Sequence, residues 1–169
     1  MTDVLDRWVE YVPVCPEVEL GMGTPRPTIQ LMDDGAGAGV RLISPATGHD
    51  FTDAMHAYAE ERVEALKAED LDGYILKRRS PSCGMERLPI YRDKRRLRGG
   101  GVGVFAGVLM AEMPGLPVEE DGRLNDAALR ENFIERIFCR FRWRQMAKSG
   151  LTRGKLVAFH TQHKLLLLS

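Results

Sequence analysis

The chain has 169 residues and a mass of 19.0 kDa, which suits one domain, or one domain with an added segment, and excludes a long multidomain protein. Hydrophobic residues make up 44% and charged residues 28% of the sequence, a composition typical of globular rather than disordered or collagen-like proteins. The 24 lysines and arginines are balanced by 24 aspartates and glutamates, so the net charge gives no general attraction to nucleic acid or to an anionic membrane.

The sequence also carries no signal for a membrane or for export. No stretch approaches the roughly 18 consecutive apolar residues of a membrane helix, and the first residues carry Asp3 and Asp6 where a secretory signal would carry basic residues. Three cysteines are too few for the disulfide framework of a small secreted protein, so we expect a cytoplasmic location with free or metal-ligating thiols. The chain stops on four leucines and a serine with nothing following to cover them, and we expect a fragment.

The first half of the chain predicts two strands and a helix. Residues 8–14 are apolar and β-branched and predict a strand, whereas the prolines and glycines of residues 15–27 exclude regular structure. Residues 40–43 predict a second short strand after the glycine-rich residues 35–39, which we expect to form an exposed connection. Apolar residues recur every three or four positions over residues 52–67 and predict a helix with one buried face.

The second half continues this alternation. Residues 73–77 predict a strand, and residues 104–113 predict an apolar helix that ends at a proline and a glycine. Residues 117–119 predict a last strand, and residues 125–148 a strong helix with an aspartate or asparagine cap. Strands alternating with helices predict an α/β fold with a mainly parallel sheet flanked by helices, a Rossmann-like three-layer sandwich, followed by a helical C-terminal segment.

Two cysteines stand in loops rich in proline and glycine. Cys15 and Cys83 each follow a predicted strand, and the carboxyl ends of parallel strands form the ligand crevice of open sheets, so we expect the two thiols to meet. Soft thiolates suit metal or iron–sulfur ligation. Neither cysteine has the close spacing of a zinc or ferredoxin motif, so two separate buried thiols are the alternative. Cys139 lies in the middle of a predicted helix and is expected to be structural.

Four segments of this chain occur in the order of a known set of motifs. They are VPVCPEV at residues 12–18, GTPRP at residues 23–27, KRRSPSCG at residues 77–84 and GVGVF at residues 101–105. In this order they resemble the successive motifs of the bacterial 2-thiouracil desulfurase family, formerly of unknown function. Four motifs in order are far more specific than any one of them, and together they cover most of the chain as far as residue 120.

The resemblance implies a [4Fe–4S] cluster held by three cysteines, with one iron free to take the sulfur of a thiocarbonyl compound. Two of these ligands match Cys15 and Cys83. The third belongs to a Cys-Leu-Leu-Gly motif on the family's first strand and has no counterpart in this chain, since Cys139 lies in the wrong region. The resemblance therefore predicts a desulfurase-like domain over residues 1–122 that lacks its usual first strand, and a cluster site impaired by the missing ligand.

The C-terminal part resembles a different region of longer family members. Residues 129–138 and 156–164 are similar to the junction with a second uncharacterised domain that often follows the first. We therefore expect residues 123–169 to be a helical linker and the start of that second domain.

The family's acid–base residues correspond to Glu17 and Ser80. A carboxylate beside a Lewis-acidic iron would activate water for attack on the carbon that bears sulfur, and Ser80 would position substrate or relay a proton. The implied reaction replaces C=S by C=O in a thiolated nucleobase or a related small thiocarbonyl compound and releases sulfide. Without the resemblance, Glu17 is better interpreted as a solvated loop acid and Ser80 as a turn or helix-cap hydroxyl.

Three further residues are candidates for substrate binding. Gly101 and Gly103 precede a predicted helix, whose N-terminal N–H groups can bind an anion, although close packing of helix on sheet explains these glycines better. Arg26 can offer its guanidinium to a carbonyl or carboxylate of the substrate, and an extended proline-rich connector explains it equally well.

Basic runs occur at residues 77–79, 92–98 and 140–144, the last interleaved with aromatic residues as on some nucleic-acid surfaces. Solvated helix faces explain such runs more simply, and nucleic acid is not the expected partner. The alternative to an enzyme is nevertheless a non-catalytic family member or an RNA-associated interaction module. His160 and His163 are spaced to share a metal on a helix, but they have no third ligand nearby, so a role in domain packing is favoured.

Overall fold

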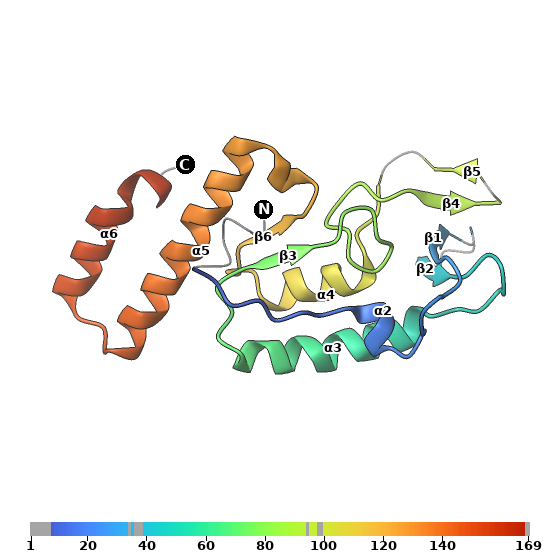
Figure 1. Ribbon diagram of the computed structural model, residues 1–169, viewed down its shortest axis with the longest axis horizontal. Helices are drawn as coiled ribbons and strands as arrows, with labels where there is room; N and C mark the ends of the chain where they lie inside the picture. The colour runs from blue at the N-terminus through green and yellow to red at the C-terminus, as the bar shows by residue number, and fades with distance from the viewer. Residues whose placement is uncertain (1–7, 34, 36–38, 94, 98–99, 168–169) are drawn as a thin grey trace.

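The computed structural model describes residues 8–33, 35, 39–93, 95–97 and 100–167 (Figure 1). The elements follow one another as α2 (Pro16–Glu19), β1 (Gln30–Asp33), β2 (Val40–Ile43), α3 (Thr52–Ala68), β3 (Tyr74–Leu76), β4 (Ile90–Arg92), β5 (Arg95–Arg96), α4 (Val104–Glu112), β6 (Val118–Glu120), the 3-10 turn η1 (Arg123–Asn125), α5 (Ala127–Lys148) and α6 (Arg153–Leu167). The chain is therefore a mixed α/β protein with two long C-terminal helices.

The strands form two separate sheets rather than one mainly parallel sheet. The first has the strand order β2-β1-β4-β5, and the second is the pair β3-β6. β1 is parallel to β4, and β3 is parallel to β6, but β1 is antiparallel to β2 and β4 is antiparallel to β5. The predicted Rossmann-like sandwich is therefore not confirmed. The connections β1–β2 and β4–β5 are too short for the crossover of a dozen or more residues that parallel neighbours need.

The strand predicted over residues 8–14 is wrong. This segment forms no β-ladder with any described residue, and Trp8, Tyr11 and Val12 are exposed. Apolar and β-branched residues favour a strand only where a neighbouring strand accepts their backbone hydrogen bonds. Among the described residues β3 pairs only with β6, so residues 8–14 have no strand partner for their backbone hydrogen bonds there.

The other predicted elements are confirmed within a few residues, and four short ones were missed. The helices over residues 52–67, 104–113 and 125–148 and the strands over residues 40–43, 73–77 and 117–119 all form. The segment predicted as irregular begins with the single turn α2, and β1, β4 and β5 were not predicted. Of the predicted exposed connection over residues 35–39, the central part lies outside the described residues.

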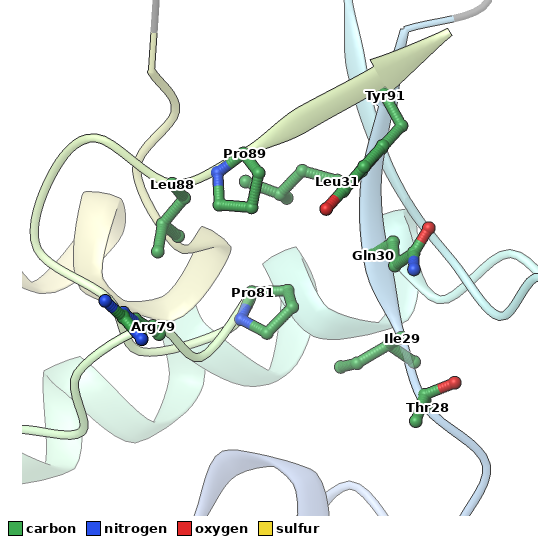
Figure 2. A pocket seen from close by; sticks show the side chains of 9 residues that line it. All are labelled: Thr28, Ile29, Gln30, Leu31, Arg79, Pro81, Leu88, Pro89 and Tyr91. Carbon is green, nitrogen blue, oxygen red and sulfur yellow. The ribbon is translucent and has the colours of Figure 1, made fainter. Parts of the chain in front are cut away.

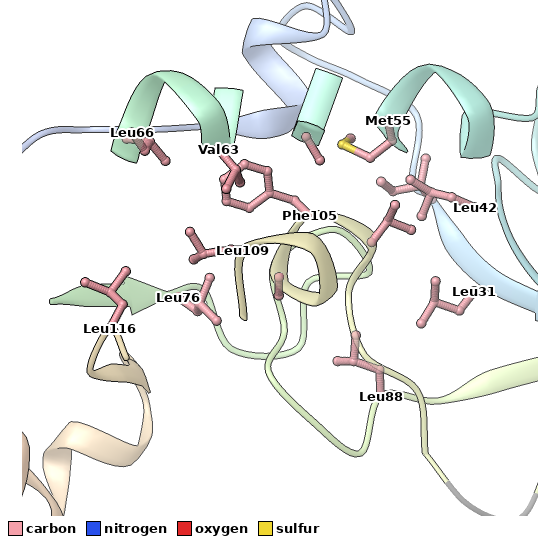
Figure 3. Close-up of a cluster of buried hydrophobic side chains, with 14 residues drawn as sticks. Leu31, Leu42, Met55, Val63, Leu66, Leu76, Leu88, Phe105, Leu109 and Leu116 are labelled. Atoms are coloured by element: carbon pink, nitrogen blue, oxygen red, sulfur yellow. The ribbon is translucent and has the colours of Figure 1, made fainter. Parts of the chain in front are cut away.

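The main core lies between α3, α4 and the sheets (Figure 3). The face of α3 predicted to be buried is buried, with Met55, Ala59, Val63 and Leu66 all inaccessible to solvent. Phe105 of α4 is fully buried, and its ring centroid lies 6.1 Å from those of Tyr58 and Tyr74. Leu31, Leu42, Leu76, Leu88 and Leu109 complete this core. Helix α3 contacts α2, and the start of α4 contacts the Ser80–Gly84 turn, so this core supports both segments of the candidate site.

Helix α5 is fastened to the α/β body by its buried side and by two arginines. Phe133 and Ile137 pack in a second, smaller core with Leu124. Arg140 donates to the backbone carbonyl of Leu71 at 3.0 Å, and Arg144 forms a two-pronged ion pair with Asp72 at 2.8 and 2.6 Å.

Helix α6 packs beside α5 at the end of the molecule far from the four-stranded sheet (Figure 1). The ring of Trp143 on α5 meets that of Phe159 on α6 at 5.3 Å, and His163 is buried beside Phe159. None of the helices in the described part of the chain has the length and apolar character needed to cross a membrane. The division into a domain over residues 1–122 and a second segment over residues 123–169 stays a prediction.

Candidate active site

Cys15 lies at the point where the extended N-terminal segment enters α2. It is the N-cap residue of this turn, and Pro16 occupies the first helical position, where its fixed φ and missing N–H are tolerated. The Cys15 carbonyl accepts from the amides of Val18 and Glu19 at 3.0 and 2.9 Å, and the Cys15 amide donates to Glu19 Oε1 at 3.0 Å. The thiol is exposed. The turn thus places Cys15 and Glu17 on one short, hydrogen-bonded element.

Contacts of Glu19 also hold α2 against the long helix α3. Tyr58 donates its hydroxyl proton to Glu19 Oε2 at 2.7 Å, and Arg62 forms an ion pair with the same oxygen at 3.3 Å. Burial and the hydrogen bond to the Glu19 carboxylate both raise the pKa of Tyr58, so its hydroxyl keeps the proton that it donates. Because α3 belongs to the main core, the position of α2 is set by the fold.

Cys83 lies in a turn that Ser80 closes. The Ser80 hydroxyl oxygen accepts from the amides of Ser82 and Cys83 at 3.3 and 3.2 Å, and the Ser80 carbonyl accepts from the Gly84 amide at 2.7 Å. The Ser80 hydroxyl therefore stabilises a turn, in line with the alternative interpretation of Ser80 as a turn hydroxyl. The same hydroxyl also faces Glu17, as described next.

The carboxylate of Glu17 is the centre of a hydrogen-bond network between the two loops. Its Oε1 accepts from the Ser82 hydroxyl at 2.5 Å and from the Ser80 hydroxyl at 3.1 Å, and its Oε2 accepts from Arg26 Nε at 2.6 Å. Ser82 is fully buried, whereas Glu17 is half-buried. The structure thus joins Glu17, Ser80, Ser82 and Arg26 in one network, and the catalytic roles of Glu17 and Ser80 stay predictions.

The network fixes the charge state of Glu17. Partial burial raises the pKa of this carboxyl group, but the hydrogen bonds from Ser82, Arg26 and Ser80 lower it by more, so the net pKa is below the ordinary value of 4.5. Glu17 is therefore ionised at neutral pH. An ionised carboxylate accepts hydrogen bonds from both hydroxyls and can take up a proton that one of them passes to it.

Both thiols lie at the edge of this network. Arg26 Nη2 is 4.0 Å from the Cys15 sulfur, and the Cys83 sulfur is 3.8 Å from the Ser82 hydroxyl oxygen. Burial raises the pKa of the Cys83 thiol to about 11, so without a metal Cys83 is a neutral thiol at pH 7. Binding as a thiolate ligand would therefore release a proton from Cys83.

The remaining cysteine is elsewhere. Cys139 lies on α5, is partly buried and has its pKa raised by burial, which agrees with the structural role predicted for it. In the part of the chain that the structure describes, no group of three or more His, Cys, Asp or Glu side chains is arranged to hold a metal ion. The described residues therefore supply two thiols, Cys15 and Cys83, as candidate metal ligands. The site that the resemblance implies has three.

The three residues predicted to bind substrate have contacts within the protein. Arg26 is the ion-pair partner of Glu17. Gly101 exchanges both backbone hydrogen bonds with Leu88, at 2.8 and 2.9 Å. A Cβ atom on Gly103 would lie 2.5 Å from the backbone of Ser82. A Cβ atom on Gly101 would lie 2.9 Å from the Leu31 side chain, so close packing accounts for both glycines, and their role in substrate binding stays a prediction.

The backbone N–H groups at the N-terminus of α4 donate hydrogen bonds to the Ser80–Gly84 turn. The amides of Gly103, Val104 and Ala106 donate to the carbonyls of Gly84, Pro81 and Ser82, respectively, at 2.8, 3.3 and 3.2 Å. These N–H groups are therefore not available to an anion, contrary to the binding mode considered from the sequence. Instead they fix the loop that carries Cys83, and the missing side chain of Gly103 permits this approach.

The histidine pair and the basic run at residues 140–144 lie on the C-terminal helices, whereas the run at residues 77–79 directly precedes Ser80. His163 is buried, with its ring centroid 4.5 Å from that of Phe159, and its role in domain packing stays a prediction. In the basic runs, Lys77 pairs with Asp121 and Arg92 with Asp33, both at 2.7 Å. These contacts leave RNA binding as an untested alternative.

Sequence reasoning missed Ser82, although this residue makes the shortest hydrogen bond to Glu17. A usable signal exists in the Ser-Pro-Ser spacing, because two hydroxyls two residues apart on a tight turn reach the same side of the chain. The ion pair between Arg26 and Glu17 has no such signal in the sequence, since no sequence pattern shows that the chain after α2 folds back on Glu17.

Two comparisons with known proteins found a match for the chain. The model of the 2-thiouracil desulfurase family matches residues 1–121. The chain belongs to the 2-thiouracil desulfurase family. Among solved structures, a [4Fe-4S]-dependent thiouracil desulfidase, TudS, superposes with a TM-score of 0.58 and 26% sequence identity, covering 76% of this chain and 78% of that chain. No curated protein matches the chain. Desulfuration of thiouracil fits both comparisons.

Proposed function

We propose that this protein hydrolyses the C=S bond of thiouracil or a related small thiocarbonyl compound. Water adds its oxygen to the carbon that bears sulfur, the C–S bond breaks, and the products are the C=O compound and hydrogen sulfide, with no net electron transfer. The observation that carries the proposal is the network in which Glu17, beside Cys15, binds the hydroxyls of Ser80 and Ser82, beside Cys83.

Cys15 and Cys83 are the residues that would hold an iron–sulfur cluster through their sulfurs. A bound cluster supplies Lewis-acidic iron that polarises the thiocarbonyl group. The described residues place no third thiolate beside these two, so this chain supplies only part of the ligand set implied by the family resemblance. The 26% identical TudS is described as [4Fe-4S]-dependent, which supports the assignment of the two thiols to such a group.

The polar residues of the network would transfer protons during the reaction. Ser80 accepts from two backbone amides, so its own proton is directed at Glu17 Oε1. Ser80 would therefore take a proton from the attacking water as it passes its own proton to Glu17, which returns it to the departing sulfur. Arg26 holds the opposite oxygen of the carboxylate and keeps Glu17 aimed at the two serines.

The test is anaerobic reconstitution of the full chain with iron and sulfide, followed by incubation with 2-thiouracil in water labelled with heavy oxygen. We expect sulfide and uracil in equal amounts, with the label in uracil. Glu17→Gln should abolish turnover while its iron content is unchanged, and Glu10→Gln, at an exposed position on the same N-terminal segment, should not. Turnover that survives in Glu17→Gln, or uracil without the label, would contradict the proposal.

A further inference from the structure

The charged residues of this chain are distributed unevenly, although its net charge is zero. Residues 136–169 carry eight lysines and arginines and no aspartate or glutamate, whereas residues 1–135 carry 16 basic and 24 acidic residues. The C-terminal part therefore has a net charge of +8 and the rest of the chain a net charge of −8. A charge separation of this size attracts the basic end of one molecule to the acidic part of another.

Helix α6 has one side packed on α5 and the opposite side exposed. Phe159 packs on α5, with its ring centroid 5.3 Å from that of Trp143. The opposite side carries four exposed side chains, two of them basic: Arg153, Val157, His160 and Lys164. They recur at spacings of four, three and four, as residues on one side of a helix do. We call them the α6 face.

The positive charges of the α6 face are not neutralised within the described chain. The ion pairs that α5 and α6 form there belong to Arg144 and Lys148 of α5. Arg153 and Lys164 are exposed and have no ion-pair partner among the described residues. Their charges are therefore free to attract a partner.

Large apolar side chains lie exposed on the same helix. Leu156 is 41% exposed, Val157 is 59% exposed and Leu165 is 87% exposed. Exposed apolar side chains that gather among charged ones mark a surface where another molecule docks. Helix α6 combines both features.

The outer side of α3 carries the opposite charge. It presents one alanine and four acids, all of them exposed: Asp53, Ala57, Glu60, Glu61 and Glu64. By their helical spacing they lie opposite the buried residues of α3, and we call them the α3 face. Its two end acids contact neighbouring basic residues at 3.6 and 2.9 Å, whereas Glu60 and Glu61 form no ion pair with a described residue.

The two faces match in spacing and in side-chain size. Arg153 and Lys164 are eleven positions apart, as are the first and last acids of the α3 face, which corresponds to about 16 Å along a helix. Val157 follows the first basic residue by four positions, and Ala57 follows the first acid by four. A valine that meets an alanine lets two helices approach to the usual distance of roughly 8–10 Å. Such a contact would pair opposite charges along its whole length.

The two faces of one chain are far apart. In Figure 1, α5 lies between α6 and the α/β body, and α3 runs along the lower edge of that body. The side of α6 that is opposite α5 therefore points away from the rest of its own chain. The α6 face can meet an α3 face only in another copy.

Arg79, a basic residue of the α/β body, has different surroundings. Figure 2 shows it beside a cavity of about 240 Å³ that three buried residues of the main core help to line: Ile29, Leu31 and Leu88. No other described basic residue lines this cavity. Positive charge gathered beside exposed apolar side chains is thus a feature of α6 and not of this part of the body.

We propose that two copies of this chain associate through these faces, with the α6 face of one copy on the α3 face of the other. Nucleic acid and anionic membranes are less suitable partners, because the net charge of −8 on residues 1–135 repels both. Two copies related by a two-fold axis would form the contact twice. Neither face includes a thiol or Glu17, so the inference is independent of the proposed function.

The test is sedimentation velocity of the full chain at about 20 mM and about 500 mM salt, because salt screens exposed charges. At low salt the mass of the wild type should exceed the 19.0 kDa of one chain, and at high salt it should fall toward this value. The double variants Arg153→Glu with Lys164→Glu, and Glu60→Lys with Glu61→Lys, should each weaken self-association at least tenfold, since like charges then meet. Circular dichroism verifies that both variants fold.

Two further samples make the test specific. Arg95→Glu with Arg96→Glu is the matched control, since it changes the net charge by the same amount at exposed positions of β5, and it should associate like the wild type. An equimolar mixture of the two face variants should regain association, because the new glutamates on α6 then meet the new lysines on α3.

Three results would overturn the proposal. The first is a wild type that sediments as a single chain at both salt concentrations, whether or not it binds RNA or vesicles of an anionic phospholipid. The second is equal weakening by the control and by the face variants. The third is a mixture of folded face variants that does not associate.

Discussion

The Ser82 hydroxyl donates a 2.5 Å hydrogen bond to the Glu17 carboxylate, although the two residues are 65 positions apart in the chain. Ser82 is fully buried and lies next to Cys83, and Glu17 is two residues after Cys15. One charge-assisted bond therefore ties together the two loops that carry the candidate ligands. Hydrogen bonds to ionised groups are about twice as strong as neutral ones, so this contact contributes to stability as well as to the geometry of the site.

Removing this hydroxyl should destabilise the protein. We expect Ser82→Ala to lower the free energy of unfolding by roughly 1.5–3 kcal/mol, because a half-buried carboxylate loses its shortest hydrogen bond. Urea denaturation at neutral pH measures the change. Ser44→Ala is the matched control, since Ser44 is equally buried but its hydroxyl has no partner among the described residues, and its loss should cost less than about 0.5 kcal/mol. Equal destabilisation by the two variants would contradict the role given to Ser82.

The contact between α4 and the Cys83 loop depends on a missing side chain. A Cβ atom on Gly103 would lie 2.5 Å from the backbone of Ser82, so Gly103→Ala must displace either the loop or the helix. We expect a loss of roughly 1–3 kcal/mol, in the range of overpacked cores. Thermal denaturation measures this loss as a decrease in the melting temperature of Gly103→Ala.

Gly107→Ala, on the same helix, serves as the control for Gly103→Ala. A Cβ atom there would meet only Val102, at 3.8 Å, so this change should stabilise the helix by up to about 1 kcal/mol. If both alanines stabilise the protein, the close approach of α4 to the loop is not required by the fold.

The attachment of α5 to the α/β body should depend on Arg144 and Asp72. Their two-pronged ion pair is mostly shielded, with side-chain exposures of 19% and 27%. A double-mutant cycle of Arg144→Ala and Asp72→Ala should give a coupling of about 1 kcal/mol. The exposed pair of Lys77 and Asp121 is the control and should give a coupling near zero. A coupling no larger than in the control would show that the pair does not hold α5.

His163 should make the packing of α6 sensitive to acid. Burial lowers the pKa of His163 below its ordinary value of 6.5, and the nearby charge of Arg142 lowers it further. The unfolded chain then binds a proton at a higher pH than the folded chain, so stability is full above about 6.5 and is lost as the pH falls through the folded pKa. Titration of the imidazole by NMR should give a midpoint below 6.5, and a midpoint at or above this value would contradict the burial of His163.

The extent to which the sequence predicts the fold differs from element to element. The helix over residues 52–68 was predicted well because its buried side recurs every three or four residues, a signal that needs no knowledge of its partners. The strand at residues 8–14 was wrong for the opposite reason, since a strand requires a neighbour that the sequence pattern cannot show. For the same reason β1 and β4 were not predicted, because they are short and partly polar and form only beside a neighbouring strand.

The candidate site shows the same contrast. Turn-forming residues around Cys15 and Cys83 indicated two loops whose thiols would meet, and the structure places both thiols at the edge of one network. The hydrogen-bond partners could not be predicted, because no sequence pattern shows that Arg26 pairs with Glu17. Partner choice depends on the way that α2 folds over the Ser80–Gly84 turn, which is a tertiary contact.

The central claim is that Cys15 and Cys83 belong to one metal-binding desulfurase site and that Cys139 does not. Iron and acid-labile sulfide, measured per chain after anaerobic reconstitution of the wild type and of three single variants, test it most directly. We predict that Cys15→Ser and Cys83→Ser lose most of the iron bound by the wild type, while Cys139→Ser retains it. Iron retained by Cys83→Ser and lost from Cys139→Ser would contradict the site described for this protein.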